Sequence, residues 1–461
     1  MKKLKIMDRL SELPESLILR ILSFLEMRDV VRTTLLSKGW KDLWTTIPSL
    51  YFDESKKSLV QTRKFINGVL QSWKGTKILS FKITFGKAYD ASLSGNVDFW
   101  VGFAMERKVE VLFLCLPYDS EKPAMAESDP VHLPPQCLYS CLSIRKLKLI
   151  GYSIQLDQEN GNVQWDRLKS LTIHGRCVSE DLLNQLVSSA TRLEILHAVL
   201  CGSCQKLSIR SSSLKKLTLS HYALLPFADG YDPSNYAALT IWAPNLEALS
   251  ISGATYRPCL LLNVPSLTDV ALHFYDYCDV RVGETLKKLL PAIQHVKALT
   301  LSLCCFKVLG VMKAKCSFSN VKLLKFVGCP IEPYDLVGLV DFFPNVEKLV
   351  FDWKRDEWNR VFIANQSQKH DFGENYSESE ANQSSFMMQL RAVEVTWYAY
   401  KTTSMFLFIK FLMKHATMLK KMVIKKGGKD AVQSHVVLRT AIELLSLQRS
   451  FPTTDLIFCK K

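Results

Sequence analysis

His197, Cys201 and Cys204 form the one group in the sequence whose types and spacing resemble a metal site. A structural zinc site needs four ligands, and a catalytic one needs three ligands and a water molecule. No fourth ligand is evident near this trio, which follows a stretch that we expect to be a strand. We therefore interpret these residues as a strand end and its turn, and we expect neither a metal nor another cofactor.

Motifs of known catalytic sites are absent from the sequence. It contains no Gly-x-Ser-x-Gly, no Walker-type phosphate loop and no His-Glu-x-x-His. The Gly-rich segment 425–429 is too short to hold a phosphate and lies outside a strand–loop–helix context. Asp356 and Glu357 stand in a polar segment and resemble solvated charge more than an acid/base pair. The sequence thus predicts a protein without catalytic activity.

A largely neutral surface along a predicted sheet is the best candidate for binding. Side chains alternate along a strand, so the residue between two buried positions points away from the core, as does the residue two further on. Small neutral surfaces bordered by aromatic side chains, here Tyr222, Tyr256, Tyr275 and Trp353, suit protein recognition. The alternative is a surface without a ligand. The candidate target-binding residues are Thr172, His174, Thr218, Ser220, Ser250, Ser252, His273, Thr300, Ser302, Lys325 and Asp352.

These positions derive from a short pattern, apolar-x-x-apolar-x-apolar, that recurs thirteen times from about residue 76 onward. The first copy is Ile78-Phe81-Ile83 and the last is Leu419-Met422-Ile424. Around the middle of the chain the copies begin at 144, 168, 193 and 214. This pattern and period are typical of leucine-rich repeats, in which each unit adds one short strand to a parallel sheet. We therefore predict an α/β fold, an irregular leucine-rich-repeat solenoid with a parallel β-sheet on its concave face.

Helices and loops are expected between the strands. The sequence predicts helices over 180–189, with Ser179 as N-cap, and over 283–296, 334–343, 403–416 and 431–447. The segment 120–135 reads as a polar insertion. We divide the chain into a tail at 1–7, a helical bundle at 8–53, a solenoid at 76–353, a polar flexible loop at 354–385 and a C-terminal region at 386–461 that continues the solenoid.

Three short helices are predicted within residues 8–53. Pro14 stands in the first turn of the first helix, where a missing N–H is tolerated. Asp29 is the expected N-cap of the second helix, and Ser37 that of the third. The bundle has more apolar residues than so small a unit can bury, so it either docks on another protein or caps the following domain.

The run LPESLILRILSFLEMRDVVRTTLLSKGWKDLW resembles an F-box, the module of Skp–cullin–F-box (SCF) ubiquitin ligases that docks on the adaptor. It is most similar to the F-box of plant proteins with leucine-rich repeats, and residues 386–461 resemble their C-terminal FBD region. Gly39 departs from the usual Arg and weakens the third helix. The residues that match the family pattern are Leu13, Pro14, Ser37, Lys38, Trp40 and Trp44.

The resemblance implies a non-catalytic substrate receptor of an SCF-type ubiquitin ligase. Its partners would be a Skp-type adaptor, a cullin and a target protein that the repeats bind. The alternative is a repeat scaffold that binds protein or RNA without any ligase role. The residues expected to carry adaptor docking are Leu13, Pro14, Leu17, Ile18, Ile21, Val31, Leu35 and Trp40.

Composition restricts the compartment and the partners. No apolar run reaches the roughly 18 residues of a membrane helix, so we expect no membrane. The 13 cysteines are interpreted as reduced apolar residues of an intracellular protein, in the nucleus, the cytoplasm or both. The net charge of +15 comes from scattered lysines and not from a basic stripe. That distribution argues against a nucleic-acid partner and for solubility or an acidic protein partner.

Overall fold

The computed structural model describes most of the chain in separate ranges. These are residues 13–36, 38–86, 91–116, 134–152, 163–174, 180–201, 207–222, 238–253, 259–274, 279–302, 317–328, 342–352, 388–397, 402–426 and 454–460, with single residues between 305 and 309 and at 442 and 446. The chain forms two compact units. The first comprises Met1–Leu214 and His221–Asp232, and the second comprises Lys215–Ser220 and Pro233–Lys461.

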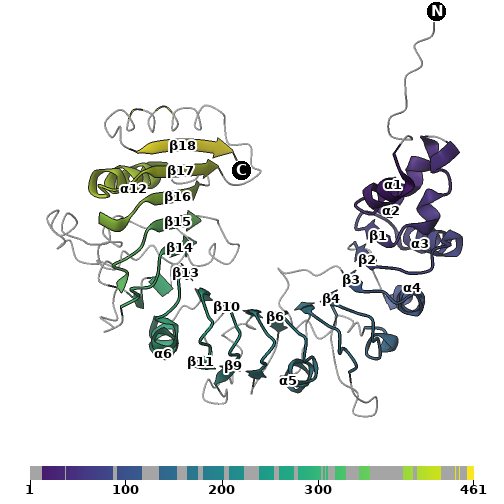
Figure 1. Ribbon diagram of the computed structural model, residues 1–461, viewed down its shortest axis with the longest axis horizontal. Coiled ribbons are helices and arrows are strands. Elements are labelled where there is room, and N and C mark those ends of the chain that lie inside the picture. Colours follow the sequence, from purple (N-terminus) through teal and green to yellow (C-terminus); the bar gives the residue numbers. More distant parts are fainter. Residues whose placement is uncertain are drawn as a thin grey trace, which may run out of the picture. The chain divides into compact units, whose positions relative to one another are not determined.

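The first unit contains a parallel sheet in which strands follow one another in chain order (Figure 1). Each strand pairs in register with the next, as Tyr51 with Lys82 and Lys82 with Phe113. A further strand, β7 (Ser208–Arg210), lies outside this order. The strands of the order are β1 (Ser49–Glu54), β2 (Ser80–Phe85), β3 (Val111–Cys115), β4 (Lys146–Ile150), β5 (Ser170–His174) and β6 (Ile195–Cys201).

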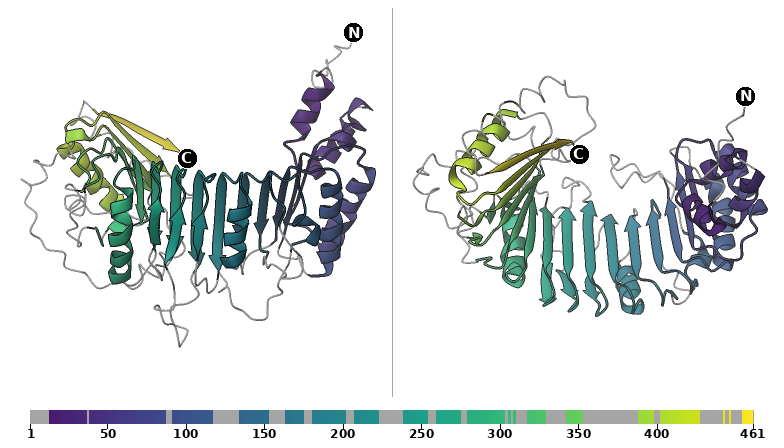
Figure 2. Two further views of the ribbon diagram at one scale, coloured as in Figure 1. Left: turned by 60° about the horizontal axis from the view of Figure 1, so that its bottom comes forward. Right: turned by 45° about the horizontal axis from the view of Figure 1, so that its top comes forward.

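The second unit repeats the same arrangement (Figure 2). Two additional strands, β9 (Leu239–Trp242) and β11 (Cys259–Asn263), pair with each other in parallel. The strands of the sheet are β8 (Lys216–Tyr222), β10 (Ala248–Gly253), β12 (Asp269–Phe274), β13 (Ala298–Ser302), β14 (Leu323–Val327), β15 (Lys348–Asp352), β16 (Ala392–Trp397), β17 (Lys421–Lys426) and β18 (Asp455–Lys460).

Alternating burial explains why these segments become strands. In β1 and β2 every second residue is buried, and the residues between them are half-buried. Each of the thirteen recurring patterns coincides with a strand, so the predicted α/β fold with a large parallel sheet is confirmed. The sequence reading missed β1 and β18, as well as β7, β9 and β11.

Two unpredicted helices of the first unit cover one face of its sheet. Helix α3 (Leu59–Ser72) begins with a capping box, in which Ser58 and Gln61 satisfy each other's backbone N–H groups. The ring centroid of Phe65 on α3 lies 6.1 Å from that of Phe52 on β1. On α4 (Ser94–Glu106), Trp100 stacks on Phe85 of β2 and donates a hydrogen bond to Asn67 at 2.7 Å.

The helices predicted between the strands agree with the structure to different degrees. Helix α5 spans Glu180–Ser189 as predicted, and α12 (Thr402–His415) is displaced by one residue from its expected bounds. Helix α6 (Asp279–Leu289) begins before Gly283 and passes into a 3₁₀ turn, η7 (Leu290–Ile293), at Pro291. The helix expected at 334–343 and the loop at 354–385 lie outside the described residues. So do the segment 120–135, apart from its last two residues, and the helix at 431–447, apart from Ile442 and Ser446.

The N-terminal bundle differs in detail from the three predicted helices. Helices α1 (Glu15–Leu22) and α2 (Met27–Arg32) form, but the N-cap of α2 is Glu26, so the assignment to Asp29 was wrong. The expected third helix is replaced by two 3₁₀ turns, η2 (Lys38–Trp40) and η3 (Leu43–Thr46), after a first turn, η1 (Thr33–Leu35). Gly39 lies within η2, where its low helix propensity favours the interruption. Among the described residues, no helix has the length and apolar character needed to span a membrane.

Candidate functional site

The N-terminal bundle leaves several large apolar side chains in solvent. On α1 the buried residues Ile18 and Leu22 face the core, while Leu17 and Ile21 are exposed on the other side. The group of exposed apolar side chains, here called the bundle's apolar surface, comprises Leu17, Ile21, Phe24, Leu25, Leu35 and Leu36. Phe24 is 77 % exposed and Leu35 is 85 % exposed. Exposed apolar side chains that are grouped in this way are typical of protein-interaction surfaces.

The eight predicted adaptor-docking residues separate into three groups by exposure. Leu17, Ile21, Leu35 and Pro14 are exposed, whereas Leu13 and Val31 are half-buried. Ile18 and Trp40 are each only 4 % exposed, so they belong to the core of the bundle and support the surface from below.

Phe24, Leu25 and Leu36 belong to the exposed group but were not among the predicted residues. A signal for the first two was present, because Phe24 and Leu25 stand three and four residues after Ile21 and continue its helical stripe past the end of α1.

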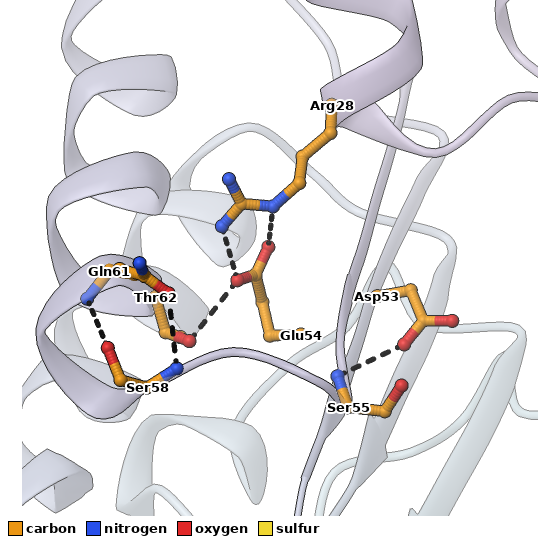
Figure 3. A network of polar contacts seen from close by, with 7 residues as sticks. All are labelled: Arg28, Asp53, Glu54, Ser55, Ser58, Gln61 and Thr62. Carbon is orange, nitrogen blue, oxygen red and sulfur yellow. Dashed lines mark hydrogen bonds and ion pairs between the residues drawn. The ribbon is translucent and has the colours of Figure 1, made fainter.

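An ion pair ties the bundle to the first strand of the sheet (Figure 3). On α2, Arg28 donates from Nε to Oε1 of Glu54 at 3.0 Å and from Nη2 to Oε2 at 2.6 Å. Glu54 is the last residue of β1 and is 1 % exposed. Thr62 on α3 donates to the same carboxylate at 3.2 Å, and the Arg28 guanidinium lies 4.0 Å from the ring centroid of Phe65. Three elements therefore meet at one buried carboxylate.

The turn that follows β1 places α3 for this contact. Asp53 accepts a hydrogen bond from the backbone N–H of Ser55, and the capping box of Ser58 and Gln61 then begins α3 (Figure 3). The end of α3 is fixed to the bundle in turn, because the indole of Trp73 donates to the carbonyl of Ile47 at 2.9 Å. The bundle and the first repeats are thus one packed structure.

The open face of each sheet is formed by the strand residues that alternate with the buried ones. In the first unit, strand pairing places Lys148, Thr172 and His197 next to one another on β4, β5 and β6. His174 lies two residues beyond Thr172 on the same strand. Both predicted residues of this unit, Thr172 and His174, are half-buried on the open face.

In the second unit the predicted residues form a row across neighbouring strands. Ser252 donates to the hydroxyl of Ser220 at 2.7 Å, and Ser252 pairs with His273. Thr300 pairs with Lys325, whose ammonium lies 3.9 Å from a carboxylate oxygen of Asp352. The remaining predicted residues, Thr218 and Ser250, are half-buried on the same face.

Ser302 is not exposed on the open face, although strand pairing places it beside Val327. It is buried, and its hydroxyl donates to the carbonyl of Phe274 at 3.0 Å and contacts the Sγ of Cys305 at 3.3 Å. The alternation of burial breaks at this last residue of β13, where both Leu301 and Ser302 are buried. The prediction that Ser302 presents itself to a target was therefore wrong.

An ion-pair cluster on the second unit was missed from the sequence. Glu394 on β16 accepts Lys425 of β17 at 2.5 Å and lies 3.6 Å from Lys348 of β15. Its pKa is lowered overall: partial burial raises it, and the hydrogen bond and charge of Lys425 outweigh that effect. No local sequence motif predicts such a cluster, because Glu394 is more than 30 residues from each of the two lysines.

Three histidines of the open faces favour the neutral form. Burial lowers the pKa of His174, and the neighbouring His197 and Lys148 lower it further. Burial and Lys148 lower the pKa of His197 in the same way. Burial and Lys325 lower the pKa of His273. These groups are therefore expected to be uncharged at neutral pH.

Within the described part of the chain, no group of three or more His, Cys, Asp or Glu side chains is arranged to hold a metal ion. Cys204 of the trio named above lies outside the described residues, so the trio as a whole is not placed.

Comparison with known proteins gives two family matches. Residues 10–51 match the F-box domain, and residues 69–442 match the LRR domain described as At1g61320/AtMIF1. The F-box match includes the whole apolar surface of the bundle, and the LRR match includes all the predicted target-binding residues.

Relatives of similar organisation come from Arabidopsis thaliana. The F-box/LRR-repeat protein At3g26922 is 31 % identical over 307 residues, which are 64 % of this chain and 90 % of the relative. The F-box/FBD/LRR-repeat protein At5g56420 is 28 % identical over 74 % of this chain and 76 % of its own length. The FBD-associated F-box protein At5g56370 is 25 % identical over 98 % of this chain and its own full length.

Proposed function

Since the chain belongs to the family of F-box/LRR-repeat proteins, we propose that it is the substrate-recognition subunit of an SCF-type ubiquitin ligase. F-box domains generally bind Skp-type adaptors, and proteins of this family are typically non-catalytic adaptors. In this proposal the F-box docks on a Skp-type adaptor, which connects it to a cullin, and the repeats bind a target protein.

The apolar surface of the bundle is the observation that carries the proposal. A helix that exposes Leu17 and Ile21 beside Phe24, at 77 % exposure, presents more apolar area than a surface helix without a partner needs. Burial of apolar area contributes about 25 cal/mol per Å², and burying one Leu or Phe side chain contributes about 1.5–3 kcal/mol. The central few side chains of such a surface are expected to supply most of the docking energy.

The open faces of the sheets supply target recognition in this proposal. The chain brings its target close to the ubiquitin-transferring subunits and orients it, so it raises effective concentration without contributing a nucleophile. The ion pair between Arg28 and the buried Glu54 supports this division of labour, because it holds the first repeat in a fixed relation to the F-box. The protein would act inside the cell, in the nucleus, the cytoplasm or both.

Co-purification from plant cells tests the complete assembly. A tagged wild-type chain is expected to retain both a Skp-type adaptor and a cullin. Replacing Leu13→Ala and Pro14→Ala together is expected to reduce the recovery of both by about tenfold or more. The matched control is Phe99→Ala on α4, which removes an exposed apolar side chain of the same unit outside the F-box.

The outcome separates the proposal from a scaffold without a ligase role. A folded wild-type chain that recovers neither adaptor nor cullin would favour the scaffold. Equal recovery with the Leu13 and Pro14 variant and with the wild type would remove these residues from the docking surface.

A further inference from the structure

The open face of the first unit carries a group of lysines without acidic partners. Lys82 on β2, and Lys146 and Lys148 on β4, stand at alternate positions that point away from the buried core. Lys146 and Lys148 are exposed and Lys82 is half-buried. Among the described residues none of the three has a carboxylate within ion-pair distance. Lys148 instead lies over the ring of Phe113 on β3, with 4.7 Å between its Nζ and the ring centroid.

Other lysine and arginine side chains of this unit form ion pairs with carboxylates. At the entrance to the strands, Lys77 and Arg145 both pair with Glu110, and Lys169 pairs with Glu194 at 2.9 Å. On the open face of the second unit, Lys325 and Lys348 face carboxylates as well. The lysines on β2 and β4 therefore differ from Lys325 and Lys348, which face carboxylates.

The surroundings of these lysines reinforce the positive charge. Among the open-face positions of β1 to β6 the only carboxylate is Asp53 on the first strand, where it accepts a hydrogen bond from the N–H of Ser55. His174 and His197 lie on β5 and β6 beside Lys148, and its charge contributes to lowering the pKa of both. These groups extend over β2 to β6, so they suit an extended ligand with several carboxylates better than a single anion.

The spacing of the lysines suits an extended peptide. Lys82 and Lys148 lie two strands apart, which is about 10 Å at the usual strand separation. In an extended chain with the polyproline II conformation, residues i and i+3 point to the same side and are about 9 Å apart. A peptide crossing the strands with acidic side chains at such intervals would match both lysines.

The apolar residues of this face favour a peptide over a nucleic acid. Val111 pairs with Lys146, Ile150 follows Lys148 by two residues, and Ile195, which is 40 % exposed, precedes His197 by two residues. Aliphatic side chains contact apolar peptide residues well, whereas nucleic-acid sites use phosphate-binding arginines and aromatic stacking. The open-face positions of β1 to β6 contain no arginine.

We propose that the open face of β2 to β6 binds an acidic, partly apolar, extended segment of a target protein. This inference rests on the proposed function, because it names the class of target that the repeats would present to the ligase. Lys82, Lys146 and Lys148 bind the carboxylates, and Val111, Ile150 and Ile195 contact the apolar side chains between them.

Fluorescence anisotropy with the full-length chain tests the inference. The probe is a labelled octapeptide with glutamate at every third position and leucine at the others, compared with the same peptide carrying glutamine in place of glutamate and with a uridine octanucleotide. The wild-type chain is expected to bind the acidic peptide at least about tenfold more tightly than either comparison probe. The variant Lys146→Glu/Lys148→Glu is expected to lose at least about tenfold of that affinity.

The control variant is Lys64→Glu/Lys108→Glu, which changes the net charge equally at exposed lysines on α3 and just after α4. It is expected to bind like the wild type. Equal losses in the two variants would reduce the effect to net charge and overturn the proposal. Tighter binding of the uridine probe, or no preference for the acidic peptide, would overturn it as well.

Adaptor binding is measured on the same preparations. Both double variants are expected to bind a Skp-type adaptor like the wild type, which also shows that their F-box is folded, and circular dichroism reports on the sheet. If the Lys146→Glu/Lys148→Glu variant loses peptide binding and keeps adaptor binding, the loss is assigned to the target-binding face. If the wild type does not bind the adaptor, the result contradicts the proposed ligase role and leaves the peptide-binding proposal unaffected.

Discussion

Arg28 of the F-box and Glu54 at the end of the first strand form a two-pronged ion pair, with N–O distances of 3.0 and 2.6 Å. Glu54 is almost completely buried, and Thr62 of α3 donates a third hydrogen bond to it. Charged groups in such a setting cost desolvation energy, so the pair contributes more to a defined geometry than to net stability. It fixes the direction in which the first repeats leave the F-box.

Arg28→Met is expected to destabilise the first unit by about 3 kcal/mol, because it leaves the Glu54 carboxylate buried without its cation. The double variant Arg28→Met/Glu54→Leu is expected to recover much of that loss, since both charges are removed together. Chemical unfolding followed by circular dichroism measures the two values. A double variant as unstable as the single one would contradict the coupling.

Neighbouring residues of α1 are expected to separate stability from docking. Ile18→Ala removes a side chain that is 4 % exposed and should cost about 2–4 kcal/mol of unfolding free energy. Leu17→Ala removes an exposed side chain and should change stability by less than about 0.5 kcal/mol while weakening adaptor binding. Thermal unfolding and adaptor binding are measured for both. A large loss of stability in the Leu17 variant would show that this residue belongs to the core.

Ser302→Ala tests the corrected position of that residue. Its buried hydroxyl donates to the Phe274 carbonyl, so the variant should lose about 1 kcal/mol of stability. Binding to a target segment should not change, because the side chain is not presented to solvent. Reduced target affinity together with unchanged stability would show that Ser302 contacts the target.

Acidification is expected to weaken the fold through His273. Burial lowers the pKa of this imidazole in the folded chain, and Lys325 lowers it further. The unfolded chain therefore takes up a proton first, as the pH falls below about 6.5. The stabilisation is complete above that pH and is lost progressively as the pH falls toward the folded-state pKa. His273→Gln should reduce the loss of unfolding free energy between pH 7.5 and 5.5, and an unchanged pH dependence would contradict this account.

Most of the sheet could be predicted because each repeat leaves a periodic apolar signal. The same signal was present for β1, since Ile47, Leu50 and Phe52 have the spacing of the repeats and are all buried. They were assigned to the bundle instead. The start of helix α3 could also have been predicted, because Ser58 and Gln61, three residues apart, have the spacing of a capping box. In β18, Leu456 and Phe458 follow Thr453 where the other repeats have an apolar residue, so the pattern is incomplete.

The site was less predictable than the fold. Exposure along α1 follows from helical periodicity, but the sequence cannot assign Ile18 to the core and Leu17 to the surface without knowing which side the sheet occupies. Arg28 and Glu54 are 26 residues apart and meet only through packing. The same holds for Glu394 and its two lysines, whose strands become neighbours only in the folded sheet.

The most direct test of the central claim is isothermal titration calorimetry of the purified chain with a purified Skp-type adaptor. The wild type is expected to bind the adaptor in a one-to-one complex, and Leu17→Glu/Leu35→Glu is expected to weaken binding at least about thirtyfold. The control Phe99→Glu, an exposed apolar position on α4, should bind like the wild type. No binding by the folded wild type, or equal affinity for all three proteins, would contradict the account.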